Sequence, residues 1–182
     1  MTVATQPFTG TFVADPAHSS FQFTVAHMKI ARFSASFHDF DARLVADQQG
    51  VRLEGAARVE SISITKPPEF RESVVNGADF FDAQNYPEIT VHSDDVQFGA
   101  DGTVVARGEL TIKDVTKPVA ATGTYQPPIE DPFGSLRAAI EFSATVDRRD
   151  WGMNWQMPLP KGGDVLGYDV ELTVRIQLIK QS

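Results

Sequence analysis

The strongest constraint on the fold is a strict alternation of apolar and polar residues near the C-terminus. From Val170 to Leu178, every even-numbered residue is Val, Leu or Ile, and every odd-numbered residue is Glu, Thr, Arg or Gln. A period of two is typical of a β-strand with one buried face and one solvated face. The same alternation recurs from Val51 to Val59 and from Leu136 to Val146. A sheet built this way must bury its apolar face, and a sheet that closes into a barrel encloses it.

Length and composition predict one all-β domain. A chain of 182 residues without a linker-like segment suits a single domain over residues 1–182, in which we expect residues 1–9 to form a flexible N-terminus. The chain contains thirteen Phe but only two Trp and three Tyr, so most of its aromatic side chains are purely apolar. We therefore expect some of the Phe side chains to line an internal space.

Charge and cysteine content exclude several classes of function. A net charge of −8 argues against nucleic acid or an anionic membrane as the main partner, because both require clustered Lys and Arg. The absence of cysteine excludes disulfides and thiolate chemistry. Residues 1–10 resemble no signal peptide, and no apolar run approaches the roughly 20 residues of a transmembrane helix. These observations predict a soluble, cytoplasmic protein.

Turn signals and changes of phase divide the chain into successive antiparallel strands. Strands are expected near residues 11, 20, 30, 51, 88, 103, 119, 136 and 169, with turns at 48–50, 100–102 and 131–134. Eight or nine strands suffice to close a barrel that holds one small ligand. The apolar parity shifts after Phe37, Val59 and Val91, which indicates β-bulges and a curved sheet.

One segment between the strands has a helical period. Residues 68–75 predict a short helix that begins at Pro68 and ends near Gly77. Residues 78–82 are too apolar for a free loop, so we expect them to plug or cover one end of the sheet. The predicted architecture is thus a barrel with a short helical insert.

No set of residues has the pattern of a metal or catalytic site. Asp15 and Ser19 lie beside a histidine, but neighbours in an extended turn project in different directions, which favours a structural turn. The histidines form no H-x-H or H-x-x-x-H pair, and solvated or core histidines are the simpler interpretation: His18, His27, His38 and His92. We predict no catalytic residue, no metal and no enzymatic activity.

Two charged segments have both a functional and a structural interpretation. Residues 113–118 could hold a phosphate, but no glycine-rich loop or helix follows, which favours a polar hairpin tip. Residues 147–152 predict an Arg–carboxylate pair near the end of the barrel, with Trp151 as a stopper. Met153 and Trp155 alternate beyond this segment, and either pocket lining or core packing suits them.

The sequence resembles the YceI-like family, also called polyisoprenoid-binding proteins, over nearly its whole length. The matching segments occur in the family's order: DPAHSSFQFTVAH from residue 15, DFFDAQNYPEITVHS from 79, GELTIKDVTKPV from 108, VDRRDWG from 146 and GGDVLGYDVELTV from 162. The resemblance implies an extended lipocalin-like antiparallel eight-stranded barrel, whose apolar bore takes an isoprenoid chain or a similar amphiphilic lipid. It implies no catalytic residues. Ala35, Val91 and Asp114 depart from the family's pattern, and Val91, smaller than the usual Phe, is expected to widen the bore.

These observations predict a carrier or storage protein for a polyprenyl chain or an isoprenoid quinone, with that lipid bound in place of a cofactor. At about 0.3 kcal/mol per heavy atom, a chain of roughly 40 carbons gains about 12 kcal/mol without a polar anchor. The residues expected to line the bore are Phe21, Phe23, Val25, Phe33, Phe37, Ile62, Ile64, Phe80, Phe81, Ile89, Val91, Leu110, Ile112, Ile140, Phe142, Trp151, Met153 and Trp155.

Two other functions stay open at the level of sequence. One is an enzyme that processes its lipid with His27 or His92 as acid or base. The other is a filled barrel that acts as a scaffold without a ligand. Edge strands also allow a homodimer, although no part of the pattern marks an interface.

Overall fold

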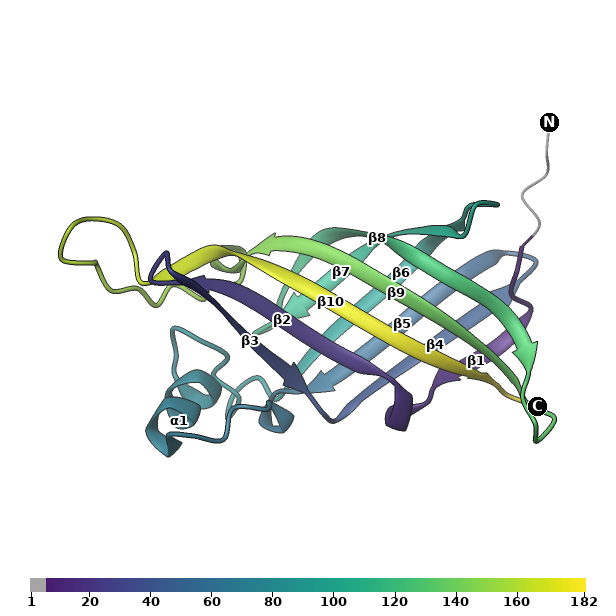
Figure 1. Cartoon of the computed structure of the whole chain (residues 1–182), viewed down its shortest axis with the longest axis horizontal. Coiled ribbons are helices and arrows are strands. Elements are labelled where there is room, and N and C mark those ends of the chain that lie inside the picture. Colours follow the sequence, from purple (N-terminus) through teal and green to yellow (C-terminus); the bar gives the residue numbers. More distant parts are fainter. Residues whose placement is uncertain (1–5) are drawn as a thin grey trace.

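A computed structural model describes residues 6–182 and shows a long antiparallel β-barrel (Figure 1). The strands are β1 (Gly10–Ala14), β2 (Ser20–His27), β3 (Ala31–Phe37), β4 (Phe40–Asp47), β5 (Gly50–Arg58), β6 (Glu88–Phe98), β7 (Thr103–Ile112), β8 (Val115–Glu130), β9 (Leu136–Asp147) and β10 (Leu166–Lys180). One α-helix, α1 (Pro68–Asn76), joins them, together with the 3₁₀ turns η1 (Pro16–His18), η2 (Val59–Ser61) and η3 (Arg148–Trp151).

The barrel closes because β1 pairs with β4 on one side and with β10 on the other. The ring therefore runs β1-β4-β5-β6-β7-β8-β9-β10 and returns to β1, with every neighbouring pair antiparallel. This arrangement confirms the predicted all-β, eight-stranded antiparallel barrel. Closure leaves no free sheet edge around this half of the molecule.

At the other end of the barrel, β2 and β3 take over the wall from β1 and β4. The long strand β10 pairs with β1 near Leu178 and with β2 from Arg175 back to Leu166. β3 is the last strand of the sheet there, and the segment after η2 lies along it, where the Ser63 amide donates to the Ser36 carbonyl at 2.7 Å. Part of the wall at this end is thus built by the insert between β5 and β6.

The predicted changes of phase have two structural origins. The shift after Val91 is a register irregularity between His92 and Asp95 of β6, as a bulge requires. The other two shifts are not bulges: the first separates β3 from β4, and the second is the 3₁₀ turn that begins at Val59. At both places a strand ends, so the change of phase marks a connection between elements and not a bend within one strand.

The helical insert forms as predicted and lies at the end of the barrel away from the termini (Figure 1). α1 has Pro68 in its first turn and Gly77 at its C-cap, and it buries Val74 and Val75. The following segment buries Phe81, whose amide donates to the Val74 carbonyl at 3.2 Å. No helix within residues 6–182 has the length and apolar character needed to cross a bilayer.

The inward side chains form two separate clusters. The floor cluster lies in the closed half and comprises Phe8, Phe12, Leu44, Ala46, Val51, Leu53, Val96, Val104, Ala106, Ala138, Ile140, Phe142, Ile176 and Leu178. The cavity cluster lies under the helical insert and comprises Ala35, Phe37, Ala57, Val59, Ile62, Ile64, Val74, Val75, Phe81, Ala83, Ile89, Leu110, Trp151 and Met153.

Phe8 belongs to the segment 1–9 that was expected to be flexible, yet it is fully buried. Its ring centroid lies 5.3 Å from that of Phe12 and 4.8 Å from that of Phe98. Residues 1–5 lie outside the described part of the chain. The sequence pattern missed this contact because a single Phe before the first strand carries no periodicity.

Candidate ligand-binding site

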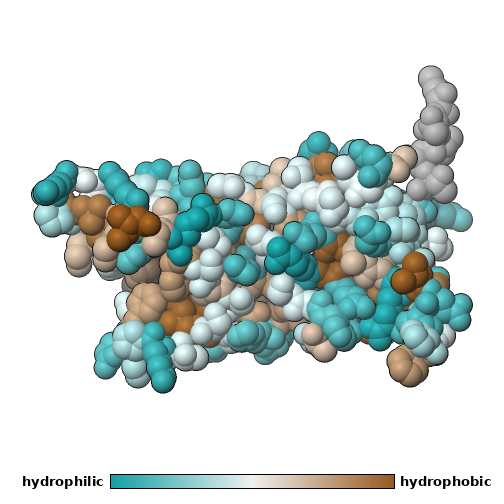
Figure 2. Space-filling model, in the orientation of Figure 1, coloured by the Kyte–Doolittle hydropathy of each residue, from teal (hydrophilic) through white to brown (hydrophobic). Residues whose placement is uncertain are grey.

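A large apolar cavity, here called the outer cavity, occupies the end of the barrel that carries α1, and its volume is about 450 Å³. Apolar side chains gather on the surface at this end, around α1 and the loop over residues 152–165 (Figure 2). The cavity walls come from six strands (β2, β3, β6, β7, β9 and β10), from α1 and the segment after it, and from η3 and the loop that follows it. Its volume falls within the usual range of ligand sites, about 300 to 1,000 Å³.

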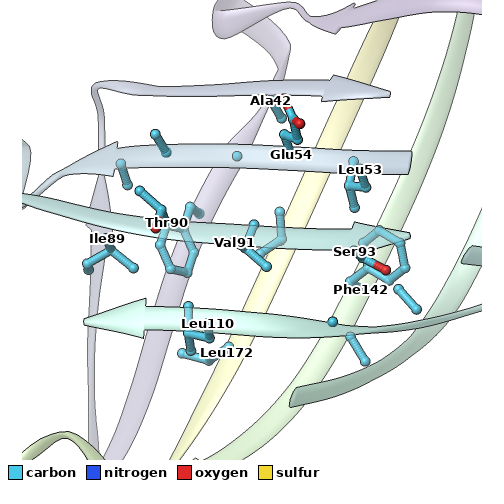
Figure 3. A pocket seen from close by; sticks show the side chains of 18 of the residues that line it. Ala42, Leu53, Glu54, Ile89, Thr90, Val91, Ser93, Leu110, Phe142 and Leu172 are labelled. Atoms are coloured by element: carbon cyan, nitrogen blue, oxygen red, sulfur yellow. The ribbon is translucent and has the colours of Figure 1, made fainter. Parts of the chain in front are cut away.

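A smaller cavity of about 130 Å³, here called the inner cavity, continues the space toward the middle of the barrel (Figure 3). Both cavities are lined by Phe21, Ile89, Leu110 and Leu172, so the two spaces adjoin, and together they are called the bore here. The inner space exists because small residues occupy inward positions on its walls: Ala42, Gly55, Ala57, Ala106, Gly108, Ala121 and Ala144. Leu53, Phe142 and Ile176 line its deep end and belong to the floor cluster.

Most residues that the sequence analysis placed in the bore line one of these cavities. The outer cavity is lined by Phe21, Phe23, Val25, Phe33, Phe37, Phe80, Phe81, Ile89, Leu110, Ile112, Trp151, Met153 and Trp155. Val91 and Phe142 line the inner cavity. Whether these side chains contact a ligand stays a prediction.

Three of the expected residues line neither cavity. Ile62 and Ile64 pack in the cavity cluster, where they support the residues that face the bore. Ile140 is on the inward face of β9, one step deeper than Phe142, and is buried in the floor cluster. Parity gives the face of a strand, whereas depth along the barrel depends on the register between strands.

The structure adds lining residues that the sequence analysis did not name. Val146, Val170 and Leu172 share the parity of the alternating strands, so the same signal was sufficient to find them. Phe70 and Val74 come from α1, whose placement depends on tertiary packing. The glycines and alanines of the inner cavity gave no signal because they contribute little or no side chain.

The polar side chains of the outer cavity are few: His27, Ser73 and Arg148. The whole Arg148 residue is only 5% exposed. Its Nε donates to the Gly167 carbonyl at 2.8 Å, Nη2 donates to the Leu166 carbonyl at 3.3 Å, and Nη1 donates to the Met153 carbonyl. Burial lowers the pKa of Arg148, because a low-dielectric environment disfavours the charged form.

The Arg–carboxylate pair predicted over residues 147–152 is formed by Asp147 and Arg149, whose closest approach is 2.5 Å. The hydrogen bonds from Arg149 lower the pKa of Asp147. Trp151 is 2% exposed, and its Nε1 donates to the Leu110 carbonyl at 3.2 Å, so it ties η3 to β7. Trp151 lines the outer cavity from this position.

The remaining candidate residues lie apart from the bore. His92 is on the outer face of β6, 3.0 Å from Asp94, and His18 contacts Asp15 at 2.9 Å near the opposite end. No group of three or more His, Asp and Glu side chains within residues 6–182 is arranged to hold a metal ion. Of residues 113–118, only Lys113 and Asp114 form the tip of the β7–β8 hairpin, and the rest belong to β8. Lys113 Nζ donates to the Ala78 carbonyl.

A closed antiparallel barrel with a packed floor and an apolar bore that opens under a helical insert defines a lipocalin-like class of β-barrel. Comparison with known proteins places the chain more narrowly. The YceI-like domain matches residues 12–178, and the chain belongs to this family. The resemblance noted in the sequence is thereby confirmed.

Related proteins cover nearly the whole chain. A UPF0312 protein of Staphylococcus aureus strain N315 is 30% identical over 165 residues, which are 88% of this chain and 92% of that protein. Among solved structures, Burkholderia cenocepacia BcnA is similar with a TM-score of 0.73 and 19% identity, over 92% of this chain and 99% of that one. A polyisoprenoid binding domain from Saccharophagus degradans, implicated in plant cell wall breakdown, has a TM-score of 0.69 and 11% identity, over 96% and 100% of the two chains. These likenesses establish the fold.

Proposed function

We propose that this protein binds a long-chain isoprenoid or a similar amphiphilic lipid, such as a polyprenyl chain or an isoprenoid quinone, and that it carries or stores this lipid. The observation that carries the proposal is the pair of adjoining apolar cavities that make up the bore. Its lining is dominated by aliphatic and aromatic side chains. The fold shared with a polyisoprenoid binding domain supports the same assignment.

The length of the bore favours a chain over a compact ligand. Residues of β10 line the two cavities from Leu166 to Ile176. At about 3.3 Å per residue this distance is roughly 30 Å along the strand, and at a tilt of about 40° it is roughly 25 Å along the barrel axis. An extended apolar chain fills such a space and buries its whole length, whereas a compact ring system leaves part of it unfilled.

The two alternatives have less support in the geometry. A filled scaffold barrel leaves no internal space, whereas the outer cavity alone measures about 450 Å³. For an enzyme, His92 is on the outer face of the barrel and is half exposed, so it cannot reach a lipid in the bore. His27 does line the outer cavity, and His27→Ala tests whether any turnover of a bound lipid depends on it.

The experiment that tests the proposal is native mass spectrometry of the protein purified from its own source, followed by organic extraction of the released compound. We expect a stoichiometric isoprenoid or quinone. A protein that is empty and also takes up no added polyprenol or quinone would contradict the proposal.

A matched pair of variants assigns the ligand to the bore. Leu172→Trp places a large side chain where the two cavities meet, and we expect it to reduce the amount of bound lipid. Thr173→Trp places the same side chain on the opposite face of β10, where lipid content should not change. Equal lipid loss in both variants would show that the ligand lies elsewhere.

A further inference from the structure

Arg148 is a buried cation without an anionic partner. It is 5% exposed and lines the outer cavity. The nearest carboxylate in sequence, Asp147, is held by Arg149 at 2.5 Å, and no carboxylate within residues 6–182 lies within ion-pair distance of Arg148. A buried charge without a counter-charge is costly, so its presence in an apolar cavity needs a reason.

The contacts of Arg148 orient the guanidinium without neutralising it. Its three nitrogens donate to the carbonyls of Met153, Leu166 and Gly167, and its Cζ lies 4.9 Å from the centroid of the Tyr168 ring. Carbonyl oxygens and an aromatic ring carry partial charges only. Each terminal nitrogen also has a second N–H group, for which the residues from 6 to 182 provide no acceptor.

The rest of the bore offers no comparable group. In the inner cavity, the hydroxyl of Ser93 already donates to the Arg107 carbonyl at 2.7 Å. The side chains of Asp41 and Glu54 are largely exposed to solvent, so these residues border the cavity mainly with their backbone. Among the residues that line the bore, the buried cation therefore lies at the outer end, in the same cavity as His27 and Ser73.

We propose that Arg148 binds the anionic head group of an amphiphile, a carboxylate or a phosphate, while the apolar tail extends into the inner cavity. This inference rests on the proposed function, since it assumes a lipid in the bore. A carboxylate or phosphate oxygen accepts the two free N–H groups of the guanidinium and supplies the missing counter-charge. The protein then selects its ligand by head group as well as by tail.

Three probes with one common tail test the proposal: farnesol, farnesoic acid and farnesyl monophosphate. A charge-assisted hydrogen bond in a buried site changes affinity by about 10- to 100-fold. We expect the acid, the phosphate or both to bind more tightly than farnesol by this factor in the wild-type protein. The acid and the phosphate are measured separately, which distinguishes the two head groups.

Variants at two neighbouring arginines assign the effect to one side chain. Arg148→Gln should lower the affinity for the anionic probes to that for farnesol, while the affinity for farnesol stays unchanged. Arg149→Gln is the matched control, because Arg149 is half exposed and pairs with Asp147 outside the cavity. It should keep the preference for the anionic probes.

The outcomes separate the two proposals. If none of the three probes binds and longer polyprenols also fail, the proposed function is wrong. If all three bind the wild-type protein equally, or if Arg148→Gln weakens them equally, the head-group proposal is overturned and the lipid-binding proposal stands. If Arg148→Gln does not fold, the order of the three affinities in the wild-type protein decides the question.

Discussion

Replacing Ala144 by Leu should narrow the inner cavity near its junction with the outer cavity, because Ala144 pairs with Leu172 of β10. Ala144 is on the inward face of β9 and lines the inner cavity of about 130 Å³. The substitution adds three carbon atoms, and each buried methylene contributes about 0.8 kcal/mol, so the empty protein should gain up to about 2 kcal/mol of stability. A ligand whose tail reaches this depth must give up the same space.

The loss of affinity follows from the number of displaced contacts. At about 0.3 kcal/mol per atom, three lost tail atoms cost about 1 kcal/mol, which is roughly a fivefold increase in Kd. The assay is a calorimetric titration with isoprenols of increasing length, together with urea unfolding of the ligand-free protein. We expect the affinity for short isoprenols to stay unchanged and the affinity for long ones to fall.

Ser143→Leu is the control, since it adds the same side chain one residue away on the outer face of β9. It should change neither short-chain nor long-chain affinity. A loss that is equal for every chain length, or one that also occurs in the control, would refute the assignment of the tail to the inner cavity. A drop in stability of about 1–3 kcal/mol would show that the inner cavity has no room for the added atoms.

Three further variants test the floor cluster, the ion pairs of Asp15 and the hydrogen bond of Trp151. Phe8→Ala should destabilise the protein by about 3–5 kcal/mol in urea unfolding and leave isoprenol affinity unchanged, because Phe8 packs in the floor cluster. Hydrogen bonds from His18 and Arg137 lower the pKa of Asp15 to about 2, whereas the pKa of an unfolded Asp is about 3.9. The stabilisation by Asp15 is therefore present above about pH 4 and is lost as the pH falls toward 2, so thermal unfolding of Asp15→Asn and wild type should converge only at low pH. Trp151→Phe removes a buried indole donor and should cost about 1–3 kcal/mol in urea unfolding.

Each of these expectations has a contradicting result. A change in isoprenol affinity in the Phe8 variant would mean that the floor cluster communicates with the bore. A constant difference in melting temperature between Asp15→Asn and wild type from pH 7 to pH 2 would show that the charge of Asp15 does not stabilise the protein. An unchanged unfolding free energy in the Trp151 variant would show that its hydrogen bond to β7 contributes nothing.

The alternation of β10 and β9 predicted the inward faces of the barrel because the backbone itself fixes a period of two. The same rule did not give depth: Ile140 and Phe142 share a parity, yet only Phe142 reaches a cavity. Depth follows from strand register, which depends on pairings distant in sequence. Phe70 was missed for the same reason, since the position of a helix on a sheet is set by tertiary packing.

The empty space of the bore was the part hardest to predict. Gly55 and Gly108 shape the inner cavity by lacking a side chain, and a sequence pattern records only the side chains that are present. At Gly108 an added Cβ would lie 2.2 Å from the His92 carbonyl oxygen, so close strand contact also demands glycine there. Arg148 was predicted only as part of a structural charge pair, because a cation is not expected in an apolar cavity.

The innermost residues of the floor cluster lie outside the bore, and this bears on the stability of the protein without a ligand. Four residues of this cluster are almost completely buried and line neither cavity: Phe8, Phe12, Leu44 and Leu178. The closed half of the barrel is therefore held together whether or not a guest is present. A ligand bound in the bore would then raise the free energy of unfolding only by mass action, by about 2.7 kcal/mol at a ligand concentration of 100 times Kd. We therefore expect the ligand-free protein to stay folded, and a lipid of the proposed kind to bind and leave without unfolding of this half.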